Sequence, residues 1–267
     1  MTAIAPAPLT TPHLVEPDAG LAGLLHEASA HPAVLHPLLG RAAEGTSCVQ
    51  GAVLRRFARE YGGYSAWYSF CLRQVLSRVP GPHRAPWQRR LRQELGQFDD
   101  GDCQVLRRAG IAPRTVQGVP RAALFARIAE ALGAGDGERD GVAVRSTGAA
   151  AAWRTRLLRL LTDASPATAI GAIALGTEFV ARAIYRQLLA GVLAQGSLRC
   201  SAFVFLELQC LVNPRQAGLF AVVEELAATP AGIDGLREGM RAALQLRCEF
   251  HDRVYVGAME PVFALAN

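Results

Sequence analysis

Apolar residues recur every three or four positions along most of the chain after about residue 19, which is the period of an amphipathic α-helix. Strand-like alternation is almost absent, and the one β-like run, FVFLEL at 203–208, lies in helical surroundings. The pattern predicts helices over about 21–36, 53–78, 87–95, 124–133, 149–163, 166–194, 198–228 and 232–258. We therefore expect an all-α bundle of about seven to nine helices without internal repeats.

Breaks in this pattern suggest the domain organisation. Residues 1–18 are rich in Pro, Thr and Ala and are expected to form a flexible tail. The remainder, 19–267, is expected to be a single domain. Its clearest loop is 134–148, and Ser165-Pro166 is a helix-start signal. Gly62-Gly63 is expected to bend the helix over 53–78.

Composition and charge narrow the possible functions. The chain has 267 residues, 51% hydrophobic and 19% charged, which is enough apolar material for a packed core. All 28 basic residues are Arg, and they are scattered apart from the knot Arg89, Arg90 and Arg92. We therefore expect no nucleic-acid partner, despite the net charge of +5. The absence of Lys excludes a Schiff-base lysine and the lysine of a phosphate-binding loop.

The six cysteines and the N-terminus bear on location. No two cysteines are spaced as CxxC, which is typical of buried, reduced thiols rather than of zinc ribbons or redox dithiols. The first residues lack the basic start and apolar core of a signal peptide. The longest apolar stretch, Ala167–Ala181, is interrupted by Glu178. We expect a cytoplasmic protein without a membrane partner.

General catalytic motifs are missing. The sequence contains no GxGxxG, GxSxG or HExxH. His26 and His31 are five residues apart, so they do not share a helix face, and His36 is also more typical of packing than of a metal site.

Several local segments, in order, give a more specific lead over about residues 45–260. They are Phe57–Tyr68 with Leu76–Pro80, Leu91-x-x-Glu94-x-Gly96, Leu124-Phe125 to Gly133, Ile170–Glu178 and Phe205–Ala217. Together they resemble the heme-oxygenase-like diiron oxidases, also described as iron-containing redox enzymes. The resemblance implies a heme-oxygenase-like helical bundle.

The resemblance also implies where metal ligands would lie, and most are replaced. In that family Glu, His, Glu, His, Asp and His hold two irons. Glu94 and Glu178 match the glutamates, whereas the first histidine falls on Arg121, or on Gly101 if spacing is weighted. The positions of the His-x3-Asp-x2-His motif hold Gln209, Asn213 and Gln216. Because neutral amides are poor iron ligands, we expect no cofactor at an ordinary diiron centre; a mononuclear iron site is the alternative.

The residues themselves allow more than one interpretation. Glu178 shares a helix stripe with small residues and Tyr185, which favours an interior position. Glu94 fits the same site or an exposed helix end. Asn213, Pro214 and Gln216 fit either a helix capping box or, with Gln209 and Phe205, an inward polar site.

Two further features are ambiguous. His251 is the one histidine in the last helices, where it would be a packing residue or an acid–base group. Tyr61, Tyr64 and Tyr68 form a stripe that is more typical of core than of a pocket.

Our hypothesis is therefore a small-molecule tailoring enzyme of specialised, natural-product biosynthesis that acts without an ordinary diiron centre. The resemblance implies amino-acid-like or fatty-acid-like substrates. Candidate catalytic residues are Glu178, Glu94 and His251; candidate substrate-binding residues are Gln209, Asn213, Gln216, Arg121, Phe205 and Tyr185. The alternatives are a non-catalytic partner of an active homologue and an iron-dependent oxygenase with a divergent ligand set. We expect a homodimer.

Overall fold

The structure is a computed structural model that describes residues 20–44, 48–134, 148–196, 202–213 and 217–266. These residues form helices and no strand, which confirms the all-α prediction. The predicted tail and most of the predicted loop over 134–148 lie outside the described residues.

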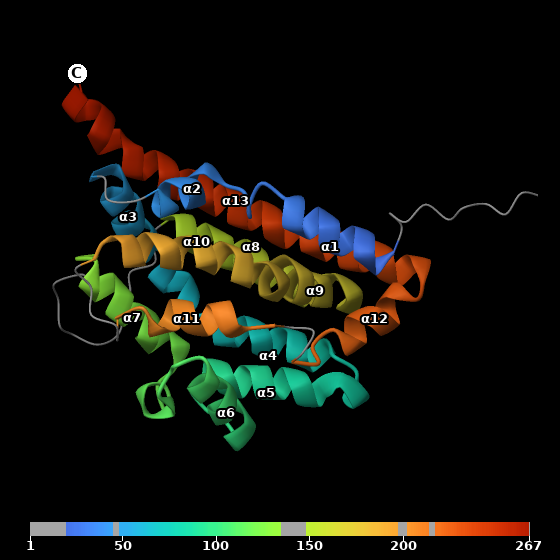
Figure 1. The fold of residues 1–267 in the computed structure, drawn as a ribbon. Helices are drawn as coiled ribbons and strands as arrows, with labels where there is room; N and C mark the ends of the chain where they lie inside the picture. The colour runs from blue at the N-terminus through green and yellow to red at the C-terminus, as the bar shows by residue number, and fades with distance from the viewer. Residues whose placement is uncertain (1–19, 45–47, 135–147, 197–201, 214–216, 267) are drawn as a thin grey trace, which may run out of the picture.

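The described residues form more helices than expected, because several long predicted segments are divided. They are α1 (Leu21–Ala30), α2 (Pro37–Ala43), α3 (Cys48–Ser65), α4 (Tyr68–Arg78), α5 (Arg84–Glu94), α6 (Asp100–Arg108), α7 (Arg121–Ala131), α8 (Gly148–Asp163), α9 (Pro166–Ile173), α10 (Val180–Ala194), α11 (Val204–Leu211), α12 (Ala221–Ala227) and α13 (Pro230–Ala266). Figure 1 shows α13 running beside α1 and α2, while α4, α5 and α6 lie on the opposite side of the bundle.

Two expected long helices are interrupted. The helix expected over 53–78 continues through Gly62-Gly63 and breaks instead at Ala66-Trp67. The helix expected over 198–228 ends at Leu211, where Val212 is extended with ψ of 120°. Asn213 comes next and precedes Pro214, and a proline disfavours the helical conformation at the residue before it. The β-like run 203–208 lies in helix α11, so local β-propensity does not decide its structure.

Helix α6 lies in a stretch, 97–120, for which the apolar pattern predicts no helix. Its start is fixed by a capping box: the Asp99 carboxylate accepts from the Asp102 backbone N–H at 2.8 Å, and the Asp102 carboxylate accepts from the Asp99 N–H at 3.2 Å. Polar capping therefore defines this helix where periodicity does not.

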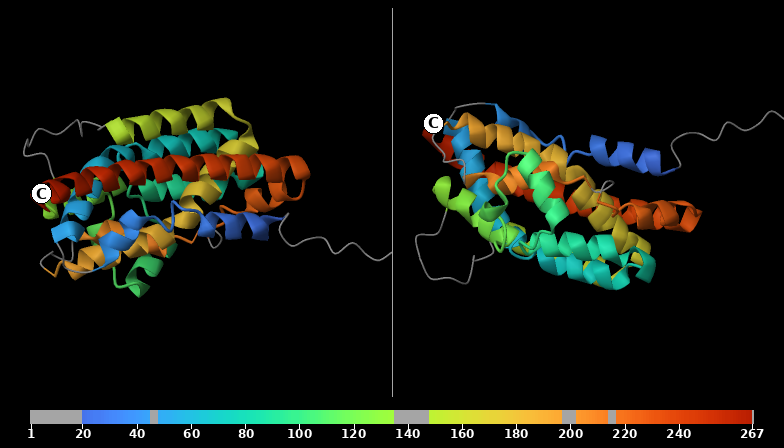
Figure 2. Two further views of the ribbon diagram at one scale, coloured as in Figure 1. Left: turned by 90° about the horizontal axis from the view of Figure 1, so that it is seen from above. Right: turned by 60° about the horizontal axis from the view of Figure 1, so that its bottom comes forward.

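The centre of the bundle is the segment Pro166–Ala194, which joins α9 and α10 through a π-helical turn at Ala174–Phe179. Ser165 caps its start as predicted, accepting from the Thr168 N–H at 3.1 Å. Helix α13 packs most extensively on α9 (Figure 2). The approach is close: a Cβ at Gly239 would lie 1.8 Å from the Thr168 carbonyl oxygen.

Pro166–Ala194 is also the one described helix long and apolar enough to cross a membrane, but 78% of its most apolar window is buried inside the bundle. Such burial is typical of a core helix. Glu178 lies near its middle, in the π turn.

Candidate functional site

Two glutamates from different helices meet at one arginine. Glu94 ends α5, and Glu178 lies in the π turn between α9 and α10. Arg90 Nη1 donates to Glu94 Oε2 at 3.0 Å, and Arg90 Nε lies 3.0 Å from Glu178 Oε1. All three side chains are at most 3% exposed. Arg90 therefore pairs with both carboxylates inside the bundle.

A tyrosine completes the shell around Glu178. The Tyr68 hydroxyl donates to Glu178 Oε1 at 2.5 Å. Burial raises the pKa of Tyr68 well above its ordinary value, and the Glu178 charge raises it further. Burial alone would lower the pKa of Arg90, but Glu178 and Glu94 raise it above its ordinary value. Tyr68 thus stays a neutral donor and Arg90 a permanent cation.

Arg121 joins the same network less completely. Its Nε lies 3.6 Å from Glu94 Oε2, which is an ion-pair distance but not a hydrogen bond. Its Nε and Nη1 are buried and have no hydrogen-bond partner in the structure. Burial, and then the positive charge of Arg90, lower the pKa of Arg121 to about 10. Its cationic form is therefore under-compensated.

An inner cavity lies beside Glu178. It is lined by Tyr61, Tyr64, Tyr68, Arg90, Thr177, Glu178, Ala181, Tyr185, Gln209 and Arg247. Its volume is about 20 Å³, and a cavity needs roughly 10–15 Å³ on this measure to hold one water. The inner cavity therefore accommodates water but not an organic substrate in this conformation.

The far side of the inner cavity is aromatic and carries a further cation. Arg247 is 2% exposed, and its guanidinium carbon lies 5.1 Å from the centroid of the Trp153 ring. The Tyr64 ring stacks on the Trp153 ring, with centroids 3.8 Å apart. The hydroxyls of Tyr61 and Tyr185 are hydrogen-bonded to each other. Among the described residues no carboxylate forms an ion pair with Arg247, and the face of the Trp153 ring stabilises its charge instead.

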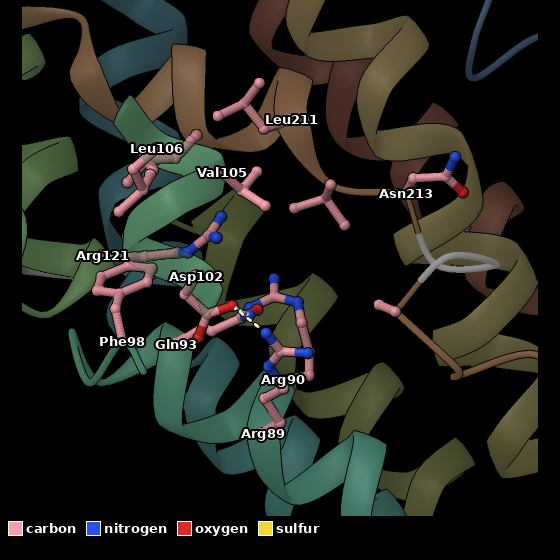
Figure 3. A pocket seen from close by; sticks show the side chains of 13 residues that line it. Arg89, Arg90, Gln93, Phe98, Asp102, Val105, Leu106, Arg121, Leu211 and Asn213 are labelled. Carbon is pink, nitrogen blue, oxygen red and sulfur yellow. Dashed lines mark hydrogen bonds and ion pairs between the residues drawn. The ribbon is translucent and has the colours of Figure 1, made fainter. Parts of the chain in front are cut away.

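An outer cavity of about 180 Å³ lies on the other side of Arg90 and Arg121 (Figure 3). Its polar side is Arg89, Arg90, Gln93, Asp102, Arg121 and Asn213, and its apolar side is Phe98, Val105, Leu106, Leu208, Leu211, Val212 and Ala217. Asp102 is already engaged, since it accepts from Arg89 at 2.8 Å and from Gln93 at 2.7 Å. Arg90 lines both cavities, whereas Arg121 lines the outer one alone.

Most of the expected site residues lie at one of these two cavities. Glu178, Gln209 and Tyr185 line the inner cavity, and Arg121 and Asn213 line the outer one. Glu94 lines neither cavity but is buried and bonded to Arg90, so it is not the exposed helix end we considered. Phe205 packs behind Tyr185, with ring centroids 5.7 Å apart. Gln216 lies outside the described residues.

The structure does not bring His251 into either cavity. Its ring is fully buried and packs on His36, with centroids 5.3 Å apart. Burial, and then the charge of Arg247, hold the pKa of His251 well below its ordinary value. The geometry therefore corrects its placement among the catalytic candidates, because a neutral ring packed away from both cavities is a core residue.

His36, Cys248 and Asp252 come close enough together to hold a metal ion, with ligand atoms within 4.8 Å of one another. The protonation of His36 argues against this use. Its Nδ1 accepts from the Leu38 N–H at 3.1 Å as a helix cap, so the neutral ring carries its proton on Nε2, which lies 3.0 Å from Asp252. A protonated nitrogen has no lone pair for a metal.

Sequence reasoning missed the two residues that organise the site. Arg90 was noted only as part of the cluster Arg89, Arg90 and Arg92, although its i,i+4 spacing to Glu94 was a signal. Tyr68 was assigned to core rather than to a pocket, and it is both: 6% exposed and bonded to Glu178. Arg247 was visible as a charge on an apolar helix face.

The donor set does not fit a diiron centre. Arg90 lies between the two carboxylates that would bridge or flank the metals, and a guanidinium offers donors but no lone pair. The residues at the expected histidine and aspartate positions within the described part of the chain are Arg121, Gln209 and Asn213. None of them is an imidazole or an anionic ligand.

Comparisons with known proteins bear on the fold. No protein-family model matches the sequence, and neither does any curated protein. Two crystal structures of a CADD-like protein of unknown function from Nostoc punctiforme PCC 73102 are similar, one with TM-score 0.64, 15% identity, and coverage of 90% of this chain and 94% of that one. The other has TM-score 0.63, 16% identity, and coverage of 90% and 96%.

A TenA homolog from Pseudomonas syringae pv. tomato str. DC3000 has TM-score 0.53, 13% identity, and coverage of 86% of this chain and 96% of that one. At these identities the likeness concerns the fold alone. The all-α, heme-oxygenase-like bundle predicted from the sequence is thereby confirmed.

Proposed function

We propose that this protein is a small-molecule enzyme of specialised metabolism that works on a heme-oxygenase-like bundle without an ordinary diiron centre. The observation that supports it most is the position of Arg90, which pairs at 3.0 Å with each of the two glutamates retained from the metal-site pattern. A fixed guanidinium charge there takes over the electrostatic role of a metal cation. With Arg121 as the second cation, 3.6 Å from Glu94, the two carboxylates need neither metal nor protonation to remain buried.

In this proposal the substrate enters the outer cavity and not the inner one. The inner cavity holds about one water, whereas the outer cavity, at about 180 Å³, can take a small organic molecule. Arg90 and Arg121 present positive charge to that molecule, and the apolar wall excludes water around its body. Glu178 contributes by orienting Arg90 and by accepting the hydrogen bond that the Tyr68 hydroxyl donates.

The second candidate is a non-catalytic partner of an active homologue. One observation favours it: both buried carboxylates are fully engaged, Glu178 by Arg90 and Tyr68, and Glu94 by Arg90. A carboxylate stabilised as an anion in this way is a weak base. Co-expression with an intact homologue encoded beside this gene, followed by co-purification, would favour this candidate over the enzyme.

The metal-free part of the proposal is tested by iron uptake. The purified chain is reconstituted with ferrous iron under argon, desalted, assayed for metal and then exposed to oxygen. We expect less than one iron per chain and no absorption of an oxo-bridged diiron centre. A heme-oxygenase-like protein with its full histidine and carboxylate set is the positive control. Two irons per chain would contradict the proposal, and one iron per chain would favour the mononuclear alternative.

The catalytic part is tested in the producing cell. A deletion strain is complemented with the wild-type gene or with Glu178→Gln, which keeps the shape of the side chain and removes its charge. We expect the variant to lose the metabolite that the wild type restores, while circular dichroism shows a folded protein. A metabolite restored by both genes would favour the non-catalytic partner.

A further inference from the structure

We infer that the inner cavity is a binding site for one small inorganic monoanion of the size of chloride, held by the guanidinium of Arg247 and the hydroxyl of Tyr64. Both residues line this cavity, beside Arg90 and Glu178. The inference goes beyond the proposed function, because an anion can occupy this cavity in an enzyme and in a non-catalytic partner alike.

The first support is the charge balance of the inner cavity. Its lining includes two arginines, Arg90 and Arg247, and one glutamate, Glu178. Glu178 is already engaged, since it accepts from Arg90 Nε at 3.1 Å. Outside the cavity Glu94 and Arg121, 3.6 Å apart, offset each other. One positive charge, that of Arg247, is therefore left without a balancing carboxylate among the described residues, and burying an unpaired charge is costly.

The tyrosines of the cavity do not supply the missing negative charge. Burial raises the pKa of each of the four, which are Tyr61, Tyr64, Tyr68 and Tyr185. Near neutral pH their hydroxyls are therefore dipoles and not anions. The Trp153 ring attracts the guanidinium of Arg247 through its face, but it carries no net charge.

The second support is a pair of buried donors without acceptors. Arg247 Nε and the Tyr64 hydroxyl are both buried and have no hydrogen-bond partner among the described residues. Trp153 positions both, because the Tyr64 ring stacks on it and the Arg247 guanidinium carbon lies 5.1 Å from its ring centroid. Buried donors without partners are rare in folded proteins, and an ion or an ordered water is a common partner. An anion accepts from both donors and, unlike water, also balances the charge of Arg247.

The third support is the volume of the inner cavity, which is about 20 Å³. This is slightly more than the roughly 10–15 Å³ that one water needs on the same measure. A chloride ion is little larger than a water molecule and has no substituents. Phosphate, sulfate and organic carboxylates are larger, so the cavity selects a monatomic anion.

The test is urea unfolding of the full chain in sodium chloride or in sodium gluconate, at equal ionic strength and pH, followed by far-ultraviolet circular dichroism. Gluconate is too large for the inner cavity, so it is the reference for general salt effects. A ligand that binds the folded chain alone lowers the equilibrium constant for unfolding. We expect this constant to fall at least about tenfold, along a saturating curve, as chloride replaces gluconate up to about 0.2 M. Identical unfolding in the two salts would overturn the inference.

Variants locate the anion. Arg247→Met keeps an unbranched side chain beside Trp153 and removes the charge, so its unfolding should be the same in chloride and in gluconate. Tyr64→Phe keeps the ring stack and removes one donor, so the effect of chloride should weaken several-fold. Arg253→Met is the matched control, because Arg253 lies on the same helix α13 and is exposed, and it should respond to chloride as the wild type does.

An equal effect of chloride in the wild type and in all three variants would refute the site, because the anion would then act elsewhere on the protein. If Arg247→Met does not fold, the comparison of Tyr64→Phe with Arg253→Met carries the test.

Crystals grown in sodium bromide give a second, direct measurement. We expect an anomalous peak within hydrogen-bond distance of Arg247 Nε and the Tyr64 hydroxyl. A cavity that holds water alone would show no bromide peak, and that result would overturn the inference.

Discussion

Replacing Arg90 by methionine tests whether a guanidinium holds the two glutamates in place. Methionine keeps an unbranched chain of similar length, so the change removes the charge and the donors with little loss of packing. Arg90, Glu94 and Glu178 are at most 3% exposed, so solvent cannot replace the lost contacts. The stability of the bundle should fall sharply.

The magnitude follows from the geometry. Removing one partner of a buried ion pair costs about 3–5 kcal/mol, since the other charge stays buried and unpaired. Arg90 pairs with two carboxylates, but Arg121 lies 3.6 Å from Glu94 and can compensate that one. One carboxylate, Glu178, is then left without a cation, and we expect the loss to fall within the same range, about 3–5 kcal/mol.

The assay is equilibrium unfolding in urea near neutral pH, followed by far-ultraviolet circular dichroism. The matched control is Arg89→Met, one residue earlier on α5, where the side chain is 40% exposed and pairs with Asp99 and Asp102. The Arg89–Asp99 pair is exposed, and the buried Asp102 keeps its hydrogen bonds from Gln93 and the Asp99 N–H, so this control should cost about 0–1 kcal/mol. The double variant Arg90→Met with Glu178→Gln should recover about 1–3 kcal/mol of coupling.

The reasoning would be refuted if Arg90→Met and Arg89→Met changed the free energy of unfolding by the same amount. It would also be refuted if the double variant were less stable than Arg90→Met alone. If Arg90→Met does not fold, a folded double variant still carries the comparison, because the neutral Gln removes the unpaired charge and keeps an acceptor for Tyr68.

Two further predictions concern the core. His251 is fully buried, and its pKa is held well below 6.5, first by burial and then by neighbouring positive charge. Below pH 6.5 the unfolded chain binds a proton that the folded chain does not. The free energy of unfolding should therefore fall as the pH is lowered, by up to about 1.4 kcal/mol per pH unit. His251→Asn should flatten this slope in urea titrations at several pH values and the exposed His26→Asn should not; identical slopes would contradict this. Gly239→Ala should cost about 1–3 kcal/mol or more by thermal unfolding, because its Cβ would lie 1.8 Å from the Thr168 carbonyl oxygen. Gly40→Ala, whose Cβ meets nothing within 4 Å, should be neutral or stabilising by about 0.5–1 kcal/mol, and an equal loss in both would count against the close helix packing.

The sequence predicted the bundle because apolar periodicity is a strong signal over long helices. Ser165 capped the start of the central segment as expected, and α8 matched its predicted range. Breaks were harder to place. The chain turns at Ala66-Trp67 rather than at Gly62-Gly63, because tertiary packing can keep glycines helical. Helix α6 was missed because its capping carboxylates, and not its apolar residues, define it.

The candidate site was predictable only in part. Glu94 and Glu178 were found because they match a family pattern, and Arg121 was placed near them by the same comparison. Arg90 was not found, since charged pairs at i,i+4 spacing are usually exposed and of little consequence. Burial changes their importance, and a single sequence does not show that the face carrying Arg90 and Glu94 turns inward toward α9 and α10.

The two arginines explain why Glu94 and Glu178 can both stay buried as anions. Without any cation, two buried carboxylates would repel each other and one would be protonated. Arg90 pairs at 3.0 Å with both, but one positive charge does not balance two negative ones. Arg121, with its Nε 3.6 Å from Glu94 Oε2, supplies the second positive charge. Its Nε and Nη1 still lack a hydrogen-bond partner among the described residues. Two guanidinium groups beside two carboxylates thus balance the charges of Glu94 and Glu178 without a metal cation.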